Sequence, residues 1–261
     1  MKNTAVITGA SGGLGREFAR LFAKDGYNLI LAARNGEKLQ KLKEETEKEY
    51  GVTAEIFICD LSETEAPEKL FAFCKEKQAE IAALVNNAGF GDFGEFYCSD
   101  LTKQTEMVQV NDMALMRLTR LILPQMIARK SGKILNVASV AAFAPGPLMS
   151  VYYATKAFVL SFTEALAVET KPYNVSITAL CPGPTKTGFE SAAALEKSGL
   201  FKNLKNADAA KTAAFGYKKM NKGKVIAVHG AGNRFLVRMM KFAPRALVRK
   251  CVYKIQKEKQ S

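Results

Sequence analysis

The chain has 261 residues, of which 48% are hydrophobic and 24% are charged. These values are ordinary for a globular protein, so they exclude a disordered tail protein, a collagen-like fibre and a disulfide-stabilised miniprotein. No uncharged apolar run is long enough to span a membrane, and the N-terminus lacks a secretory signal, which predicts a cytoplasmic protein. With one histidine, His229, and five scattered cysteines, we expect free thiols and no metal site.

The net charge of +13 is concentrated at the C-terminal end of the chain. Residues 217–261 contain 13 Lys and Arg residues against one acid, whereas the preceding 216 residues contain 25 bases and 24 acids. The body of the protein is therefore close to neutral, and the basic tail needs an explanation separate from the fold.

Short apolar segments alternate with helical patterns along the chain. Strands are predicted over 5–8, 27–33, 54–59, 81–85, 133–137, 175–180 and 224–228, and helices from Leu14 and over 36–50, 65–78, 102–129 and 151–170. This alternation is typical of right-handed βαβ units. It predicts an α/β fold with one Rossmann-type domain, 1–230, built on a doubly wound parallel sheet of seven strands, and a C-terminal extension, 231–261. The apolar segment 188–215 is either a packing helix or a substrate lid.

A glycine-rich turn follows the first predicted strand. Gly9, Gly13 and Gly15 permit a tight turn, and helical spacing of apolar residues begins at Leu14. The backbone N–H groups at the start of such a helix bind phosphate. We therefore expect a dinucleotide pyrophosphate at this turn.

The end of the second predicted strand bears on the choice of dinucleotide. An acid there binds the ribose 2′-OH of NAD, whereas a cation suits the 2′-phosphate of NADP. The strand ends in Ala32-Ala33-Arg34 without an acid, and Ser11 in the glycine turn adds a hydroxyl. The sequence favours NADP(H) over NAD(H), with a solvated Arg34 as the alternative.

Tyr152 and Lys156 are four residues apart on a predicted helix and so share a face. A phenol with a pKa near 10 is a poor acid–base at neutral pH, and a neighbouring cation lowers that pKa. Ser139 follows the fifth predicted strand, where ligands bind in open α/β sheets. Spacing alone does not separate Tyr152 from Tyr153, which also lies within a turn of Lys156.

With these features the chain resembles the short-chain dehydrogenase/reductase family, in its short single-domain branch, over roughly residues 3–230. The motifs that carry the resemblance are Thr8 to Gly15 (TGASGGLG), Asp60-Leu61, Asn86-Asn87-Ala88-Gly89, Asn111, Ser139, Tyr152 to Lys156, Pro182-Gly183 and Thr187. The resemblance selects Tyr152 over Tyr153, because the family's tyrosine stands four residues before its lysine.

The resemblance implies a catalytic set of four residues. Tyr152 would be the acid–base, Lys156 would lower its pKa and bind the nicotinamide ribose, Ser139 would orient the substrate oxygen, and Asn111 would hold a water. Asp60 would accept a hydrogen bond from the adenine amino group. Substrate contacts are expected from Ser139 and Tyr152, and cofactor contacts from Gly9, Ser11, Gly13, Leu14, Gly15, Arg34, Asp60, Leu61, Asn87, Ala88, Gly89, Tyr152, Lys156, Pro182, Gly183 and Thr187.

The tail is amphipathic, with Pro244 predicted to break it into two helices. One face is basic, formed by Arg234, Arg238, Lys241, Arg245 and Arg249; the other is apolar, formed by Leu236, Met239, Met240, Ala243, Leu247, Cys251 and Ile255. The tail either packs on the body or a second subunit, or lies on an anionic membrane. Nucleic acid is the least favoured partner, because no groove-reading motif is present.

We interpret the chain as an NADP(H)-dependent oxidoreductase that interconverts a carbonyl and a secondary alcohol. The apolar segment 188–215 and the tail favour a hydrophobic substrate, such as an acyl, steroid-like or other lipid-like ketone. Alternatives are an NADPH-binding regulator or a membrane-surface protein on the same fold without turnover. By analogy with the family, we expect a homodimer or homotetramer.

Overall fold

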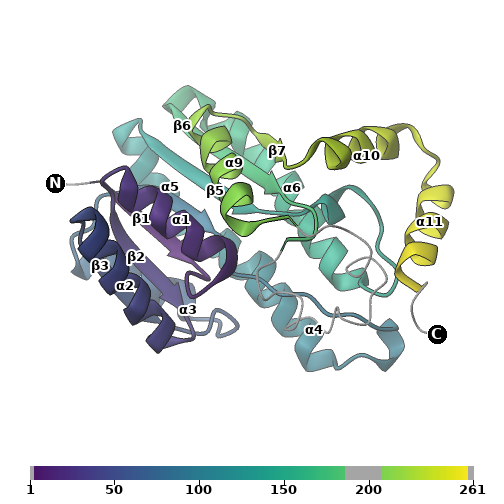
Figure 1. The fold of residues 1–261 in the computed structure, drawn as a ribbon, viewed down its shortest axis with the longest axis horizontal. Coiled ribbons are helices and arrows are strands. Elements are labelled where there is room, and N and C mark those ends of the chain that lie inside the picture. The colour runs from purple at the N-terminus through teal and green to yellow at the C-terminus, as the bar shows by residue number, and fades with distance from the viewer. Residues whose placement is uncertain (1–2, 186–206, 258–261) are drawn as a thin grey trace.

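The computed structural model describes residues 3–185 and 207–257, and its centre is one parallel sheet of seven strands (Figure 1). In space the strands follow the order β3-β2-β1-β4-β5-β6-β7, and every neighbouring pair is parallel. Their bounds are β1 Thr4–Thr8, β2 Asn28–Ala33, β3 Ala54–Ile58, β4 Ile81–Asn86, β5 Gly132–Val137, β6 Val175–Cys181 and β7 Ile226–Val228. The predicted seven-stranded, doubly wound sheet is confirmed.

Helices cover both faces of the sheet (Figure 1). Successive side chains of β1 go to opposite faces, so Ile7 joins the core under α1, α2 and α9 while Val6 joins the core under α3 and α5. The helices are α1 Gly13–Lys24, α2 Gly36–Tyr50, α3 Ala66–Glu76, α4 Leu101–Val108, α5 Leu115–Arg129, α6 Ser150–Thr170, α9 Ala209–Asn221, α10 Ala231–Phe242 and α11 Arg245–Lys257, with short 3₁₀ turns η1 Phe96–Cys98, η3 Val140–Phe143 and η4 Lys171–Tyr173.

Strand order reverses between β1 and β4, because the chain crosses the sheet after β3 to start its second half beside β1. In doubly wound sheets the loops on either side of this reversal diverge and leave a crevice at the carboxyl ends of the strands. The turn after β1 and the loops after β4, β5 and β6 all open onto that crevice. The topology therefore brings together segments that are far apart in the sequence, such as Gly9 and Thr185, which are 176 residues apart.

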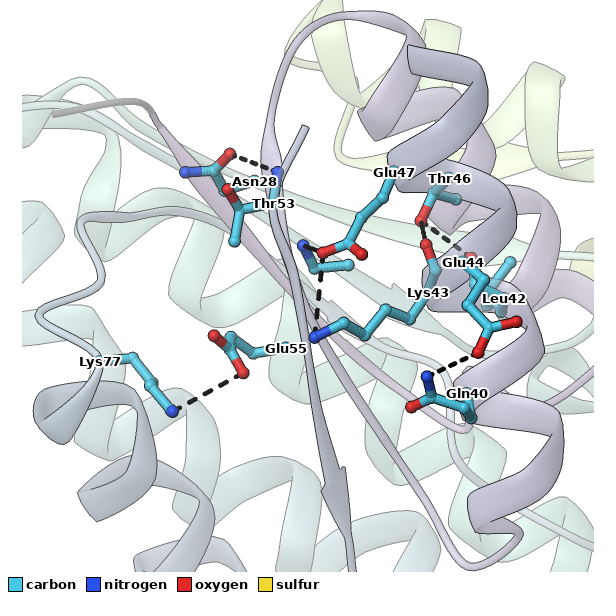
Figure 2. A network of polar contacts seen from close by, with 11 residues as sticks. Asn28, Gln40, Leu42, Lys43, Glu44, Thr46, Glu47, Thr53, Glu55 and Lys77 are labelled. Carbon is cyan, nitrogen blue, oxygen red and sulfur yellow. Dashed lines mark hydrogen bonds and ion pairs between the residues drawn. The ribbon is translucent and has the colours of Figure 1, made fainter. Parts of the chain in front are cut away.

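Polar contacts hold the first half of the sheet to α2 (Figure 2). The backbone N–H of Ala54 donates to Glu47 Oε1 at 3.0 Å, and the Lys43 ammonium lies 3.9 Å from the same oxygen. The backbone N–H of Thr53 donates to Asn28 Oδ1 at 3.1 Å, which joins the start of β2 to the start of β3. These contacts fix β2 and β3, whose carboxyl ends reach the crevice.

One predicted helix is interrupted. Instead of a single helix over 102–129, the chain forms α4, a π-helical turn η2 over Gln109–Ala114, and then α5. The π turn contains Asn111, whose side chain is held by the backbone of Phe90 and not by its own helix. Single π turns inside α-helices are frequent at functional sites.

The segment 188–215 is described only in part. Residues 209–215 form the first half of α9, in which Thr212 and Ala213 are buried against α1 and the sheet. These residues therefore belong to a packing helix. Residues 188–206 of the predicted lid, and Thr187, lie outside the described residues.

The tail forms two helices separated by Pro244, as predicted. The face that meets the body is not the predicted apolar face. Val237, Val248 and Gln256 are buried, whereas most of the predicted apolar residues, such as Leu236 and Leu247, are exposed. None of the helices that the structure describes is long and apolar enough to cross a membrane.

Candidate active site

A cavity of about 770 Å³ occupies the crevice at the carboxyl ends of the strands. It reaches from the glycine turn after β1 to the start of α6. Of the predicted cofactor and substrate residues, those that line it are Gly9, Ser11, Gly13, Leu14, Arg34, Asp60, Leu61, Asn87, Ala88, Gly89, Ser139, Tyr152, Lys156, Pro182 and Gly183. Gly15 and Asn111 are not part of its surface and lie behind it.

The glycine turn forms a tight backbone cradle. Gly9 has φ +64° and Gly13 has φ +52°, a region that side-chain-bearing residues rarely adopt. A Cβ on Gly15 would overlap the carbonyl oxygen of Gly9, and a Cβ on Gly9 would lie 2.9 Å from Ala88 Cα. Gly12 stands at the N-cap of α1, so no side chain caps the N–H groups of the first turn. This donor-rich helix start fits a pyrophosphate.

Asn87 joins the ends of β1 and β4 beneath this cradle. Its Nδ2 donates to the carbonyl oxygens of Thr8 at 2.9 Å and Gly9 at 3.1 Å. In return, Thr8 Oγ1 accepts from the backbone N–H groups of Asn87 and Ala88 at 3.0 Å each. Asn87 thus holds the turn in shape from below, in addition to lining the cavity.

Arg34 and Asp60 form the rim at the ends of β2 and β3. Arg34 Nη1 lies 3.4 Å from Asp60 Oδ2, and the arginine side chain is 77% exposed. Burial raises the pKa of the Asp60 carboxyl, but hydrogen bonds from Ser62 and the charge of Arg34 outweigh it, so the pKa lies below its ordinary value. Asp60 is therefore ionised at neutral pH and can accept a hydrogen bond from an amino group.

Ser139 and Tyr152 are joined by a side-chain hydrogen bond at the opposite end of the cavity. Ser139 is the second residue after β5. Its Oγ accepts a hydrogen bond from the backbone N–H of Ala141 at 3.1 Å and lies 3.5 Å from the carbonyl oxygen of Pro182. Tyr152 lies in the first turn of α6. The two hydroxyls therefore converge on the same point of the cavity.

Lys156 lies one turn further along α6 and is only 5% exposed. Its Nζ donates to the carbonyl oxygen of Val137 at 2.8 Å and lies 5.8 Å from the Tyr152 ring centroid. Burial lowers the pKa of Lys156 to about 8, although the nearby Asp112 carboxylate and Cys181 oppose the shift. The ammonium is thus still the main form at pH 7.

The predicted lowering of the Tyr152 pKa is not seen in the structure. Burial raises the pKa of Tyr152, and the hydrogen bond with Ser139 offsets only part of that increase. The physical reason is that the phenolate form loses more solvation energy in this buried site than the hydrogen bond with Ser139 restores. Tyr152 is therefore a neutral phenol at pH 7, a form that can donate a proton.

Asn111 lies behind Gly89 in the π turn. Its Oδ1 accepts from the backbone N–H of Phe90 at 3.0 Å, and its Nδ2 donates to the carbonyl oxygen of Phe90 at 2.9 Å and to Thr155 Oγ1 at 3.0 Å. A Cβ on Gly89 would lie 2.8 Å from Asn111 Oδ1 and 3.5 Å from Lys156 Nζ. Asn111 therefore connects the loop after β4 to α6.

Sequence reasoning did not assign the apolar residues around Ser139 and Tyr152 to the site. Ala141, Met149 and the ring of Tyr153 cluster with Tyr152 and line the cavity there. The hydroxyl of Tyr153 accepts a hydrogen bond from Gln256, whereas that of Tyr152 bonds to Ser139. The two neighbouring tyrosines therefore have different partners, and Tyr152 is the one bonded to Ser139. No periodic signal in the sequence marked the apolar residues.

The remaining chemistry-bearing side chains have ordinary surroundings. His229 Nδ1 lies 3.1 Å from Thr212 Oγ1, and its ring packs on Phe215. All five cysteines are free. Across residues 3–185 and 207–257, no group of three or more His, Cys, Asp or Glu side chains is placed to bind a metal.

The parallel sheet with its crevice at the strand ends and its glycine cradle defines a Rossmann-type α/β protein. A model of the family described as short chain dehydrogenase matches residues 3–197, so the chain belongs to that family. It is similar to a very-long-chain 3-oxoacyl-CoA reductase of Anas platyrhynchos, with 36% identity over 182 residues, covering 68% of this chain and 58% of the relative. It is equally similar to 17-beta-hydroxysteroid dehydrogenase type 3 of Mus musculus, with 36% identity, covering 70% of this chain and 60% of the relative.

Solved structures share the fold over nearly the whole chain. A short-chain dehydrogenase from Sphingobium yanoikuyae in complex with NADPH has a TM-score of 0.82 and 28% identity, covering 92% of this chain and 94% of that chain. A short chain dehydrogenase/reductase from Burkholderia phymatum in complex with NAD has a TM-score of 0.81 and 25% identity, covering 91% and 92%. The chain spans about six tenths of the length of the two curated relatives above.

Proposed function

We propose that the protein is an NADP(H)-dependent oxidoreductase that interconverts a carbonyl group and a secondary alcohol on a hydrophobic substrate. The observation that carries this proposal is the convergence of the Ser139 and Tyr152 hydroxyls, with Lys156 beside them, in the cavity that begins at the glycine cradle. A dinucleotide that binds its pyrophosphate at the cradle has its reactive end directed along the same cavity.

The side chains divide the chemistry of carbonyl reduction between them. NADPH, when bound, supplies the hydride that reaches the carbonyl carbon. Ser139 holds the substrate oxygen by its hydroxyl, and Tyr152 donates the phenolic proton to that oxygen. The positive charge of Lys156 stabilises the phenolate that remains, and the carbonyl of Val137 fixes the position of that charge. In the oxidative direction the phenolate form of Tyr152 accepts the proton of the alcohol.

The preference for NADP(H) rests on Arg34. The side chain lies on the cavity rim at the end of β2, where it is exposed and only loosely paired with Asp60. A planar guanidinium in that place can form two charge-assisted hydrogen bonds with a 2′-phosphate. Solved relatives bind either nucleotide, one with NADPH and one with NAD, so the family alone does not decide.

The test is a fluorescence titration of wild type and of the Arg34→Ala variant with NADPH and NADH. We expect Arg34→Ala to weaken NADPH binding by about tenfold to a hundredfold, in line with the loss of charge-assisted hydrogen bonds, and to leave NADH binding unchanged. Lys38→Ala, at an exposed cation on α2 that does not line the cavity, is the matched control. Equal affinities for both nucleotides in wild type would refute the preference.

Turnover separates an enzyme from a regulator that only binds NADPH. Tyr152→Phe removes the proton donor and leaves the glycine cradle intact, so it should bind NADPH and reduce no ketone. Binding without turnover in wild type would favour the regulator instead. The apolar lining by Ala141 and Met149 beside Tyr152 supports a lipid-like ketone, as do the names of the acyl-CoA and steroid relatives.

A homodimer is proposed from a cluster of exposed apolar side chains on neighbouring elements. Helices α4 and α6 are in contact, and α6 also contacts the π turn η2. Large exposed apolar residues on and beside these elements are Phe96, Tyr97, Leu101, Val108, Met113 and Phe158. Such a patch is unfavourable in water and typical of a subunit interface. Sedimentation velocity tests the proposal, and a monomer at micromolar concentration would refute it.

The exposed surface of α10 and α11 is proposed to bind an anionic membrane from the cytoplasmic side. Residues 231–257 contain eight Lys and Arg residues and no acid. Between the cations, large apolar side chains face solvent, with Phe242 87% and Phe235 67% exposed. Basic helices with exposed aromatic residues bind at the headgroup level of anionic bilayers, with about 1 kcal/mol from each cation near the surface.

Flotation with vesicles tests this contact on the full chain. We expect binding to vesicles that contain phosphatidylglycerol, and little binding to pure phosphatidylcholine. The Phe235→Ser/Phe242→Ser double variant should lose most of the binding, whereas Val168→Ser, at an equally exposed apolar residue on α6, should not. Equal flotation of the double variant and wild type would refute the proposed surface.

A further inference from the structure

Asp112 is a buried carboxyl group behind the catalytic end of the cavity. It follows Asn111 in the π turn η2 and is 8% exposed. Its Oδ1 is buried and accepts no hydrogen bond, and across residues 3–185 and 207–257 the carboxyl group forms no ion pair. A buried acid without a close partner is costly, so its position in the fold needs an explanation.

The π turn holds Asp112 against the helix that carries Lys156. The turn contacts α6, and Asn111 Nδ2 donates at 3.0 Å to the hydroxyl of Thr155, the residue immediately before Lys156. A Cβ on Gly89 would lie 2.8 Å from Asn111 Oδ1 and 3.5 Å from Lys156 Nζ, so the ammonium lies beside the same turn. Asp112 and Lys156 are therefore two buried, opposite charges that act on one another.

Two other titratable groups face Lys156, Cys181 on β6 and Tyr152 on its own helix. Burial raises the pKa of the Cys181 thiol to about 12, and it raises the pKa of the Tyr152 phenol as well. Both groups are therefore uncharged at neutral pH. Burial raises the pKa of the Asp112 carboxyl to about 7, so of the three groups Asp112 is the one that supplies a negative charge to Lys156 above that pH.

The charge of Asp112 has a direct consequence for Lys156. Burial lowers the pKa of the ammonium to about 8, and the Asp112 carboxylate opposes this shift. Without the carboxylate, burial would be opposed mainly by the hydrogen bond to the carbonyl of Val137, and the ammonium would release its proton at a lower pH. The proposed reduction needs the ammonium form, because a neutral amine does not stabilise the phenolate of Tyr152.

Asp112 also borders a second cavity, of about 360 Å³. The cavity lies between the end of α4 and the start of α6, with Val108, Ala154 and Thr155 among its lining residues. Open space beside Asp112 means that a side chain longer by one methylene group can be accommodated there. Glutamate is therefore a suitable conservative replacement for Asp112, and asparagine is the replacement of equal size without the charge.

We propose that Asp112 is a positioning residue for Lys156, whose buried carboxylate keeps the ammonium charged and thereby sets the upper pH limit of carbonyl reduction. The inference rests on the proposed reduction and adds a fifth residue to the predicted set of Asn111, Ser139, Tyr152 and Lys156. Asp112 acts through Lys156 and does not line the cavity that holds the reacting groups. The unpaired acid in the π turn thus has a function in the charge balance of the site.

The first test is the pH profile of kcat for the NADPH-dependent reduction of acetophenone. In wild type the rate should fall as the pH rises through about 8, where Lys156 loses its proton. Asp112→Asn should move this descending limb to lower pH by about one unit, which gives a loss of about fivefold at pH 8 and almost none at pH 6. Asp112→Glu should restore the wild-type profile. A loss in Asp112→Asn that is the same at every pH would indicate a structural role and overturn the proposal.

The second test follows the titration of Lys156 itself and needs no turnover. In protein labelled with carbon-13 at lysine Cε, the NMR signal that is missing from Lys156→Met identifies Lys156. Its titration midpoint should move to lower pH in Asp112→Asn and return in Asp112→Glu. Glu169→Gln, which removes the same charge from an exposed acid on α6, should leave the midpoint and the pH profile unchanged.

The two tests separate this inference from the proposed function. An unchanged Lys156 midpoint in Asp112→Asn would overturn the pairing of the two charges, whatever the activity. A shifted midpoint in a protein that reduces no ketone would confirm the pairing and refute the proposed reaction.

Discussion

Lys156 should destabilise the protein at neutral pH, even though the proposed reaction needs it. Burial lowers the pKa of its ammonium from 10.5 to about 8, which means that folding disfavours the charged form. This shift corresponds to a cost of about 3 kcal/mol below pH 8. The hydrogen bond from Nζ to the carbonyl of Val137 returns about 1 kcal/mol. Replacing Lys156 by Met removes both contributions while nearly preserving volume.

We therefore expect Lys156→Met to raise the free energy of unfolding by about 2 kcal/mol at pH 7. The sign of this difference in unfolding free energy between variant and wild type reverses as the pH rises. Since the folded-state pKa is lower than the unfolded-state pKa, the unfolded chain binds more protons between pH 8 and pH 10.5, so wild type gains stability relative to the variant across that range. Above it Lys156 is neutral in both states, and only the lost hydrogen bond remains, so the variant becomes the less stable protein.

Urea unfolding of both proteins at pH 7 and at pH 10.5 measures this difference. The contributions of the other titrating groups are the same in wild type and variant, so they cancel to first order in the comparison. The contribution of Asp112 does not cancel fully, because its carboxylate interacts with Lys156 and burial raises its pKa to about 7. An Asp112→Asn background removes that contribution. A difference in stability that is the same at both pH values, or a variant that is less stable at pH 7, would refute the electrostatic reasoning. Turnover should be lost in the variant at either pH.

Two further substitutions test the cradle and the packing of α9. Gly15→Ala places a methyl group on the carbonyl oxygen of Gly9, so it should weaken NADPH binding more than tenfold and destabilise the fold by about 2–4 kcal/mol; wild-type affinity in the titration would contradict the steric argument. Tyr217→Phe removes the 2.6 Å hydrogen bond to Asp25 that joins α9 to α1, and should cost about 1–2 kcal/mol in urea unfolding with unchanged NADPH affinity.

The nucleotide end of the cavity could be predicted from the sequence because its determinants are local. The glycine turn requires three glycines within seven residues, and Tyr152 and Lys156 share a helix face through a spacing of four. The π turn at 109–114 had no such signal. The pattern over 102–129 is helical throughout, and the interruption depends on the hydrogen bonds between Asn111 and Phe90, which is a tertiary contact.

The pKa of Tyr152 could not be predicted for a related reason. The spacing to Lys156 was correct, but the direction of the shift depends on how much water the hydroxyl loses and on where the ammonium points. In the fold Lys156 directs its Nζ to the Val137 carbonyl. The desolvation of the Tyr152 phenolate therefore determines the direction of its pKa shift. Sequence spacing reports which groups are neighbours, and the energy of the charged form depends on the surrounding packing.

The substrate end of the cavity is built by contacts between distant parts of the chain. Tyr153 and Gln256 are 103 residues apart and meet only because α11 returns over the start of α6. The family model matches residues 3–197, so Gln256 lies beyond the region that the family defines. The matched region therefore contains the glycine cradle and the hydroxyls of Ser139 and Tyr152. The C-terminal helix lies outside that region, and its Val252 packs against the cluster of Ala141, Met149 and Tyr153, which line the cavity.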